Sequence, residues 1–141
     1  MIRVVLDTNI IVSALLQPLG PSVQILVSVL GGNIELCVTG NIYAEYEEVI
    51  SRPRLQRPQD VITRTLDSIR EKGFWVRPDQ TVRACSDPDD NVFLECAQAA
   101  DAHYLVTGNL KHFPITWTGT RIVTPRWFVD NFLAEKPGQR L

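Results

Sequence analysis

The sequence predicts an α/β fold in which a mostly parallel β-sheet is covered by helices on both faces. Short apolar, β-branched segments alternate along the chain with longer segments of helical character, which is the pattern of parallel strands joined by crossover helices. The chain has 141 residues, 45% apolar and 21% charged, enough to bury one core. We expect one domain over residues 1–136 and a frayed tail over residues 137–141.

The N-terminal segments set the pattern. IRVVL (2–6) is apolar and β-branched, so it predicts a buried strand. NIIVSALL (9–16) predicts a short helix that PLGPS interrupts. SVQILVSVLGG (22–32) predicts a helix that ends on glycines, and IELCV (34–38) predicts the second strand.

Two helices and a short strand are expected in the middle of the chain. TGNIYAEYEEVISRP (39–53) opens with capping residues and closes before a proline, as helices do. The segment 57–73 predicts a further helix that ends on glycine, and FWV (74–76) predicts the third strand.

The C-terminal part repeats the alternation. DPDDNVFLECAQAADA (87–102) predicts a helix with proline in its first turn. HYLVTG (103–108) and TRIVTP (120–125) predict the fourth and fifth strands. PRWFVDNFLAEK (125–136) predicts a closing helix.

Bulk composition excludes several classes of protein. A net charge of −2 argues against a polyanion binder that depends on overall charge, although a local basic patch stays compatible with it. Cys37, Cys85 and Cys96 are scattered, so we expect small buried side chains rather than disulfides or a zinc site. The sequence shows no apolar segment of membrane-spanning length and no leader, so we expect a cytoplasmic protein.

Polar residues follow two of the predicted strands. Asp7 ends the first strand and Asn109 follows Thr107 at the end of the fourth. In parallel sheets the ligand site lies outside the carboxyl ends of the strands, so these residues are expected on one edge. A carboxylate directly after a fully buried strand suggests a functional rather than a structural role.

Further carboxylates come from two helices. Glu45 lies about 40° from Val49 on a helical wheel, at the border of an apolar stripe, whereas the two following glutamates project away. Asp87, Asp89 and Asp90 crowd one helix start. Asp87 can cap this helix, but three like charges exceed what a cap needs, and helical spacing does not decide between Asp89 and Asp90.

These carboxylates together predict a metal site. Acidic groups gathered at close range repel one another unless a cation joins them. Oxygen ligands without a histidine or cysteine cluster favour Mg²⁺ or Mn²⁺ over zinc. Such an ion activates water and steadies negative charge on phosphate, so metal-assisted phosphodiester hydrolysis is the expected chemistry.

Three sequence blocks also resemble a known family. VVLDTNIIVSALL, EYEEVISRP and DPDDNVFLECAQAADAHYLVTGN, in this order, are similar to the PIN-domain ribonucleases, and most similar to the toxin branch of toxin–antitoxin pairs. The resemblance implies a three-layer α/β/α sandwich and Mg²⁺- or Mn²⁺-dependent endoribonuclease activity. It also implies an antitoxin protein partner, and family members often form dimers, which suits the apolar helix at 22–32.

The resemblance assigns the site residues. It places the acidic positions of the family on Asp7, Glu45 and Asp90, the last because the motif's alanine falls seven residues later, and its fourth acidic position on Asn109. An amide can ligate a hard cation but supplies no charge, so a second metal becomes less favoured. The supporting residues that this implies are Asn9, Thr107, Asp87 and Asp89.

Basic residues near the predicted site are candidates for binding RNA. Lys111 is the first candidate for phosphate binding because it lies two residues from Asn109, and Arg52 and Arg54 follow the helix of Glu45. The tryptophans could stack bases, although packing roles are favoured. The alternative function, motivated by Asn109, is a catalytically degenerate PIN-like module that binds RNA or protein without cleavage.

Overall fold

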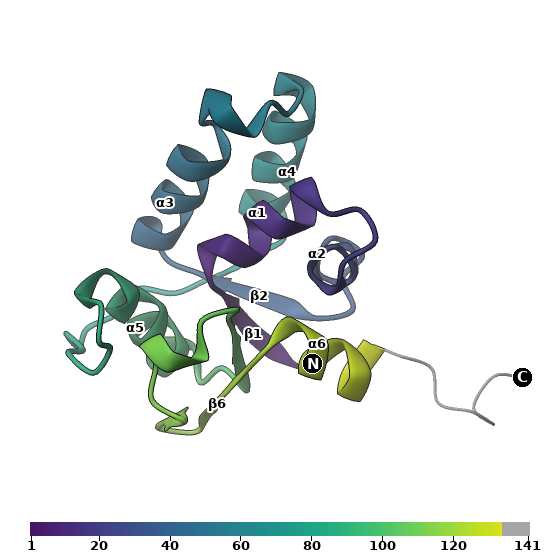
Figure 1. The fold of residues 1–141 in the computed structure, drawn as a ribbon. Coiled ribbons are helices and arrows are strands. Elements are labelled where there is room, and N and C mark those ends of the chain that lie inside the picture. The colour runs from purple at the N-terminus through teal and green to yellow at the C-terminus, as the bar shows by residue number, and fades with distance from the viewer. Residues whose placement is uncertain (134–141) are drawn as a thin grey trace, which may run out of the picture.

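A six-stranded sheet lies at the centre of the protein, with the strand order β3-β2-β1-β4-β6-β5. A computed structural model, which describes residues 1–133, gives this architecture (Figure 1). All neighbouring pairs are parallel except β5 with β6, so the sheet is mostly parallel, as predicted. The strands are β1 (Arg3–Leu6), β2 (Glu35–Val38), β3 (Phe74–Trp75), β4 (Tyr104–Val106), β5 (Thr116–Trp117) and β6 (Thr120–Val123).

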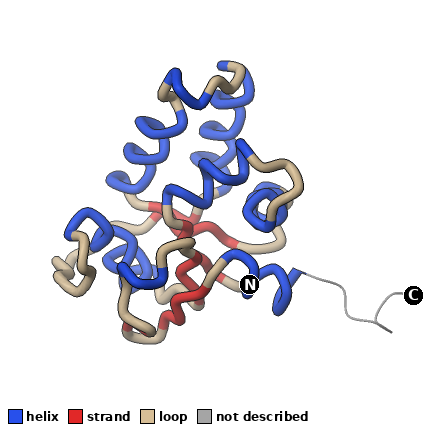
Figure 2. Tube along the Cα trace, viewed as in Figure 1, coloured by secondary structure: helices blue, strands red, loops and turns tan. Residues whose placement is uncertain are grey.

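Helices cover both faces of this sheet, which confirms the three-layer α/β/α sandwich. Helices α1 to α4 gather on one side, whereas α5 packs against β1, β2 and β4 from the other side (Figures 1 and 2). This is the arrangement that right-handed crossovers produce when the chain reverses its direction across a sheet. The helices are α1 (Thr8–Leu16), α2 (Pro21–Leu30), α3 (Gly40–Ile50), α4 (Gln59–Lys72), α5 (Asn91–Ala100) and α6 (Pro125–Phe128).

Strand β1 is the central support of the functional edge. Val4, Val5 and Leu6 are completely buried, as a strand with helices on both faces must be. Leu6 pairs with Val106 of β4, and the backbone N–H of Asp7 donates to the Val106 carbonyl at 3.0 Å. The backbone of the first residue after the strand is therefore bonded to the neighbouring strand β4.

The structure corrects the predicted elements at several boundaries. Strand β5 was not expected, because a two-residue strand leaves no periodicity to detect. The expected helix at 87–102 begins at Asn91, because Pro88–Asp90 forms a 3₁₀ turn. The closing helix continues beyond α6 as a π-helical segment, Val129–Leu133, and its predicted end and the predicted frayed tail lie outside the described residues.

The apolar N-terminal helices are part of the core. No single helix within residues 1–133 is long and apolar enough to cross a membrane. Helices α1 and α2 are long and apolar enough only when taken together, and their axes are bent by 104° relative to each other. Ile10, Ile11 and Ile25 on these helices are buried against the sheet and its neighbours.

Candidate functional site

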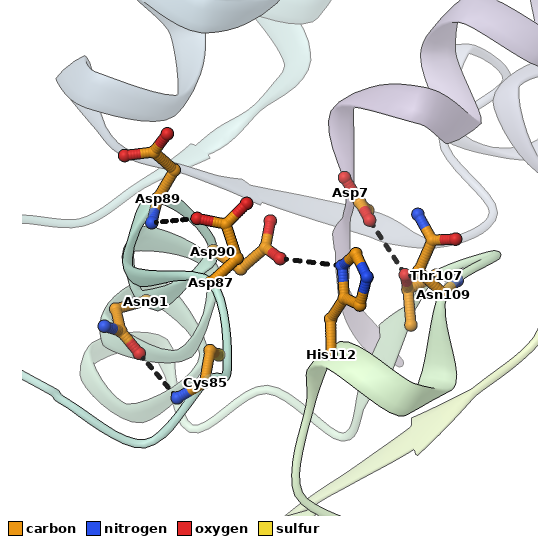
Figure 3. Close-up of polar contacts among 9 residues, drawn as sticks. All are labelled: Asp7, Cys85, Asp87, Asp89, Asp90, Asn91, Thr107, Asn109 and His112. Atoms are coloured by element: carbon orange, nitrogen blue, oxygen red, sulfur yellow. Dashed lines mark hydrogen bonds and ion pairs between the residues drawn. The ribbon is translucent and has the colours of Figure 1, made fainter.

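Asp7 is the centre of a hydrogen-bonded chain at the carboxyl edge of the sheet. The Thr107 hydroxyl donates to Asp7 Oδ2 at 2.8 Å and accepts the backbone N–H of Asn109 at 3.0 Å (Figure 3). Thr107 is completely buried and Asp7 is 5% exposed. The structure thus brings three of the predicted residues together and fixes one oxygen of the Asp7 carboxylate.

The environment of Asp7 disfavours its charge. Burial raises the pKa of Asp7, while the hydrogen bond from Thr107 and the backbone amides of Asn9 and Thr8 oppose this shift, as does the nearby His112. Such a group is more costly to ionise than an aspartate in water, and a cation beside it relieves that cost. The Asn9 side chain itself is exposed.

Asp90 faces the same region from the start of α5. Its carboxylate lies 3.2 Å from His112 Nδ1 and is only partly exposed, whereas Asp87 and Asp89 are exposed (Figure 3). Desolvation raises the pKa of Asp90, and the negative charges of Asp7 and Asp87 raise it further. The negative charge of Asp7 thus adds to the cost of ionising Asp90.

The remaining aspartates at this helix start have different roles. Asp87 Oδ1 accepts the backbone N–H of Asp89 at 3.0 Å, so Asp87 caps the turn, as its position in the sequence suggested. Asp89 points away from His112 (Figure 3). Between Asp89 and Asp90, the structure therefore turns Asp90 toward Asp7.

Glu45 comes from α3, where two consecutive residues, Glu45 and Tyr46, are bonded to α1 and to β1 respectively. Thr8 donates its hydroxyl to the Glu45 carboxylate, and Tyr46 donates its hydroxyl to the Leu6 carbonyl at 2.5 Å. Burial raises the pKa of Tyr46 well above its ordinary value, so the hydroxyl stays protonated and can donate. Glu45 is half-buried, whereas the two following glutamates are exposed, as the helical spacing predicted.

The three predicted acidic ligands do not form a preassembled cage. Among residues 1–133, no three carboxylate, imidazole or thiol groups are gathered closely enough to hold a metal ion. Glu45 is engaged by Thr8 and Asp90 by His112. The donor chemistry nevertheless fits Mg²⁺ or Mn²⁺, because Asp7, Glu45 and Asp90 offer carboxylate oxygens and Asn109 offers an amide oxygen.

The predicted RNA-binding residues lie in two places. Lys111 is exposed beside Asn109 and lines an open pocket of about 370 Å³ that also includes His112. Arg52 and Arg54 directly follow the C-terminal end of α3, the end opposite to the one that leaves the carboxyl edge of the sheet. Arg52 is paired with Glu48 at 2.8 Å, so its charge is already engaged.

Two residues of this region were not singled out from the sequence. Thr8 holds Glu45, and its position directly after Asp7 was the available signal. The Asn91 amide oxygen accepts the backbone N–H groups of Ala84 and Cys85 at 3.1 and 2.9 Å, which ties the preceding loop to α5 (Figure 3). This contact depends on a loop conformation that sequence periodicity does not encode.

Comparisons with known proteins agree with this fold. The chain is 26% identical over 143 residues to the uncharacterized protein MJ1680 of Methanocaldococcus jannaschii, covering 93% of this chain and 92% of that protein. A chain of the Rickettsia felis VapBC2 complex, solved bound to a DNA fragment from its promoter, superposes with a TM-score of 0.53 at 16% identity. That match covers 87% of this chain and 98% of the other and shows a shared fold.

The family assignment comes from the sequence pattern of the PIN domain, which matches residues 3–111. This range includes Asp7, Glu45, Asp90 and Asn109. PIN domains are in general nucleases that depend on a divalent metal ion. The chain belongs to the PIN-domain family.

Proposed function

We propose that this protein is a Mg²⁺- or Mn²⁺-dependent endoribonuclease and the toxin of a toxin–antitoxin pair. The observation that carries the proposal is the buried carboxylate of Asp7, held by Thr107 at the carboxyl end of the central strand, with the Asp90 carboxylate projecting into the same region from the start of α5 (Figure 3). Two carboxylates of raised pKa at the carboxyl edge of a parallel sheet form a site in which a hard cation would stabilise their ionised forms.

Each residue has a distinct role in this proposal. Asp7 and Asp90 would hold the ion directly, and Glu45 and the amide oxygen of Asn109 would complete the set of oxygen donors. Thr107 is a positioning residue, because it fixes one oxygen of the Asp7 carboxylate. Asn9 is exposed close to Asp7, Asp87 adds negative charge near Asp90, and Asp89 would support the site only from the same 3₁₀ turn.

The chemistry follows from this donor set. A bound Mg²⁺ or Mn²⁺ lowers the pKa of a coordinated water and neutralises charge that develops on a phosphate. The chain itself supplies the geometry: β1 and β4 hold Asp7 and Thr107, and α3 and α5 present Glu45 and Asp90. Lys111, with Arg52 and Arg54 further away, would attract the phosphates of RNA.

The proposed partners follow from the fold and the surface. The VapBC2 complex of Rickettsia felis, which shares the fold, supports an antitoxin protein as the partner of this chain. Leu16, Leu19 and Val27 on the α1–α2 corner are exposed, and Leu19 is 95% exposed. Apolar surface of this kind is typical of protein interfaces and supports a homodimer. The cytoplasm is the proposed location of this protein.

The experiment is a cleavage assay on single-stranded RNA with the purified chain in Mn²⁺, Mg²⁺ and EDTA. Wild type is expected to cleave only with metal, and Asp7→Asn is expected to lose cleavage while keeping its fold by circular dichroism. Asp67→Asn, on the exposed face of α4, is the matched control for loss of one carboxylate and should cleave like wild type. Cleavage by Asp7→Asn, or by wild type in EDTA, would reject the proposal.

A second candidate is a PIN-like module that binds RNA or protein without cleaving. Two observations favour it: Asn109 replaces a charged ligand, and Asp7, Glu45 and Asp90 are not preassembled around one point within residues 1–133. A calorimetric titration with millimolar Mn²⁺ separates the two candidates. Binding that Asp90→Asn weakens supports the enzyme, and absence of binding supports the module.

A further inference from the structure

A pocket of about 610 Å³ opens beside the candidate metal site rather than within it. It lies where β2 and β3 end and α3 begins, and its walls include Thr39, Asn41, Trp75 and Arg77. Pockets of this size accommodate a nucleotide-sized ligand. None of the acidic residues around Asp7 lines it, so the metal-site proposal leaves the pocket without a function.

Strand register connects this pocket to Asp7. Val4 pairs with Leu36, and Val38 pairs with Trp75, so Asp7, Thr39 and Val76 occupy successive positions across the same sheet edge. Neighbouring strands are about 4.8 Å apart, which places the pocket floor on the order of 10 Å from Asp7. This is within reach of a nucleotide adjacent to one bound at the metal site.

Trp75 is a fixed aromatic platform in this pocket. Its indole N–H donates to the Arg70 carbonyl at 2.9 Å, and its ring packs against Tyr43 with centroids 5.5 Å apart. The side chain is nevertheless 42% exposed. The packing role favoured from the sequence therefore accounts for only part of this side chain, which also lines the pocket.

Arg77 supplies the complementary charge. It is exposed, lines the same pocket and makes no hydrogen bond or ion pair with another residue of the 1–133 region. A fixed aromatic ring beside an uncommitted guanidinium is the combination that holds single-stranded nucleic acid, the ring by stacking a base and the guanidinium by pairing with phosphate.

We infer that this pocket is a nucleotide-binding subsite, in which Trp75 stacks a base and Arg77 contacts a phosphate of the RNA strand that passes Asp7. The inference rests on the proposed ribonuclease function and adds to it a second point of attachment next to the cleavage site. Substrates that extend across β2 and β3 would bind more tightly than shorter ones.

The direct test is a fluorescence titration in EDTA, where the proposed cleavage is silent. The probe is an oligoribonucleotide of about ten nucleotides, within the range that one small domain binds. A base stacked on Trp75 quenches its emission, so RNA should quench wild type and Trp117→Phe but not Trp75→Phe. Trp117 is the matched control because it donates its N–H to Gln98 and lies outside the pocket.

Affinity gives a second measurement of the same subsite. By fluorescence anisotropy, Trp75→Ala should bind RNA about five-fold or more weakly, whereas Trp75→Phe should retain most of the affinity. Arg77→Ala should bind more weakly and lower the salt slope by about one. Arg64→Ala, on the outer face of α4, is the control for loss of one positive charge. Circular dichroism confirms that each variant is folded.

The outcomes separate this inference from the proposed function. Quenching that survives in Trp75→Phe, absence of quenching in wild type, or unchanged affinity of Trp75→Ala overturns the subsite. If RNA is still cleaved in Mn²⁺ in that case, the ribonuclease proposal stands alone. If wild type neither binds nor cleaves RNA, both proposals fail, and Trp75 is then an exposed residue available to a protein partner.

Discussion

The hydroxyl of Thr107 can be removed with almost no change in shape by Thr107→Val. This hydroxyl is completely buried, donates to Asp7 at 2.8 Å and accepts the Asn109 N–H at 3.0 Å. A hydrogen bond to a charged group contributes about 1.5–3 kcal/mol. Asn109 is exposed, so its backbone N–H can bond to water in the variant. The free energy of unfolding of Thr107→Val is therefore expected to be about 2–3 kcal/mol lower than that of wild type at neutral pH.

This loss should depend on pH. The hydrogen bond from Thr107 favours the ionised form of Asp7, so it lowers a pKa that burial has raised. Its full contribution is present above the pKa of Asp7 in the folded protein and decreases as pH falls through that pKa. Thr120→Val is the matched control, because the buried Thr120 hydroxyl donates to the neutral Ala102 carbonyl at 2.7 Å. Its expected cost is about 1 kcal/mol at any pH.

Urea unfolding of both variants in EDTA, at acidic and at mildly alkaline pH, measures the difference. The account predicts that Thr107→Val is the more destabilised variant at alkaline pH and that the two converge in acid. Equal costs at both pH values would refute the reasoning, because they would mean that Thr107 does not interact with the charge of Asp7. In Mn²⁺, the same variant should cleave RNA about ten-fold or more slowly than wild type, since groups that orient metal ligands typically have effects of this size.

Three further predictions concern the same edge of the sheet. Burial raises the pKa of Asp7 above its ordinary 3.8, so wild type in EDTA should lose stability as pH rises through the pKa of Asp7 in the folded protein. Asp7→Asn should therefore melt at a higher temperature than wild type at neutral pH, and a lower melting temperature would contradict this. Tyr46→Phe removes the bond to the Leu6 carbonyl and should lower the unfolding free energy by about 1–2 kcal/mol in urea, with an unchanged value showing that the bond is not significant. Asn109→Asp adds a charged ligand and should bind Mn²⁺ several-fold more tightly by calorimetry; unchanged affinity would place Asn109 outside the site.

The order of strands and helices was predictable from the sequence because each central element has a clear period. The segment at 2–6 is apolar without alternation, and the glutamates of α3 separate cleanly into one inward and two outward residues. The two-residue strand β5 and the 3₁₀ turn at Pro88–Asp90 were not predictable in this way. Strand β5 pairs with the neighbouring β6 across a tight turn, and the 3₁₀ turn is held by bonds from Asp89 and Asp90 to Asp87, so each is too short to leave a period in the sequence.

The candidate site was predictable as a location but not as a geometry. Strand ends placed Asp7 and Thr107 on one edge, and the structure joins them by a hydrogen bond. Helical spacing could not choose between Asp89 and Asp90, because the 3₁₀ turn rotates both away from α-helical positions. The partner of Glu45 was also not predictable, since Thr8 lies on α1 and Glu45 on α3, and only the packing of these two helices brings them together.

The central claim is that Asp7 and Asp90, with Glu45 and Asn109, bind one hard cation. The most direct measurement is an anomalous difference map from a crystal of this protein grown in Mn²⁺. The account predicts a single strong peak in contact with carboxylate oxygens of both Asp7 and Asp90, displacing His112 from Asp90. A map without a peak beside Asp7, or with Mn²⁺ bound elsewhere while His112 still contacts Asp90, would contradict it.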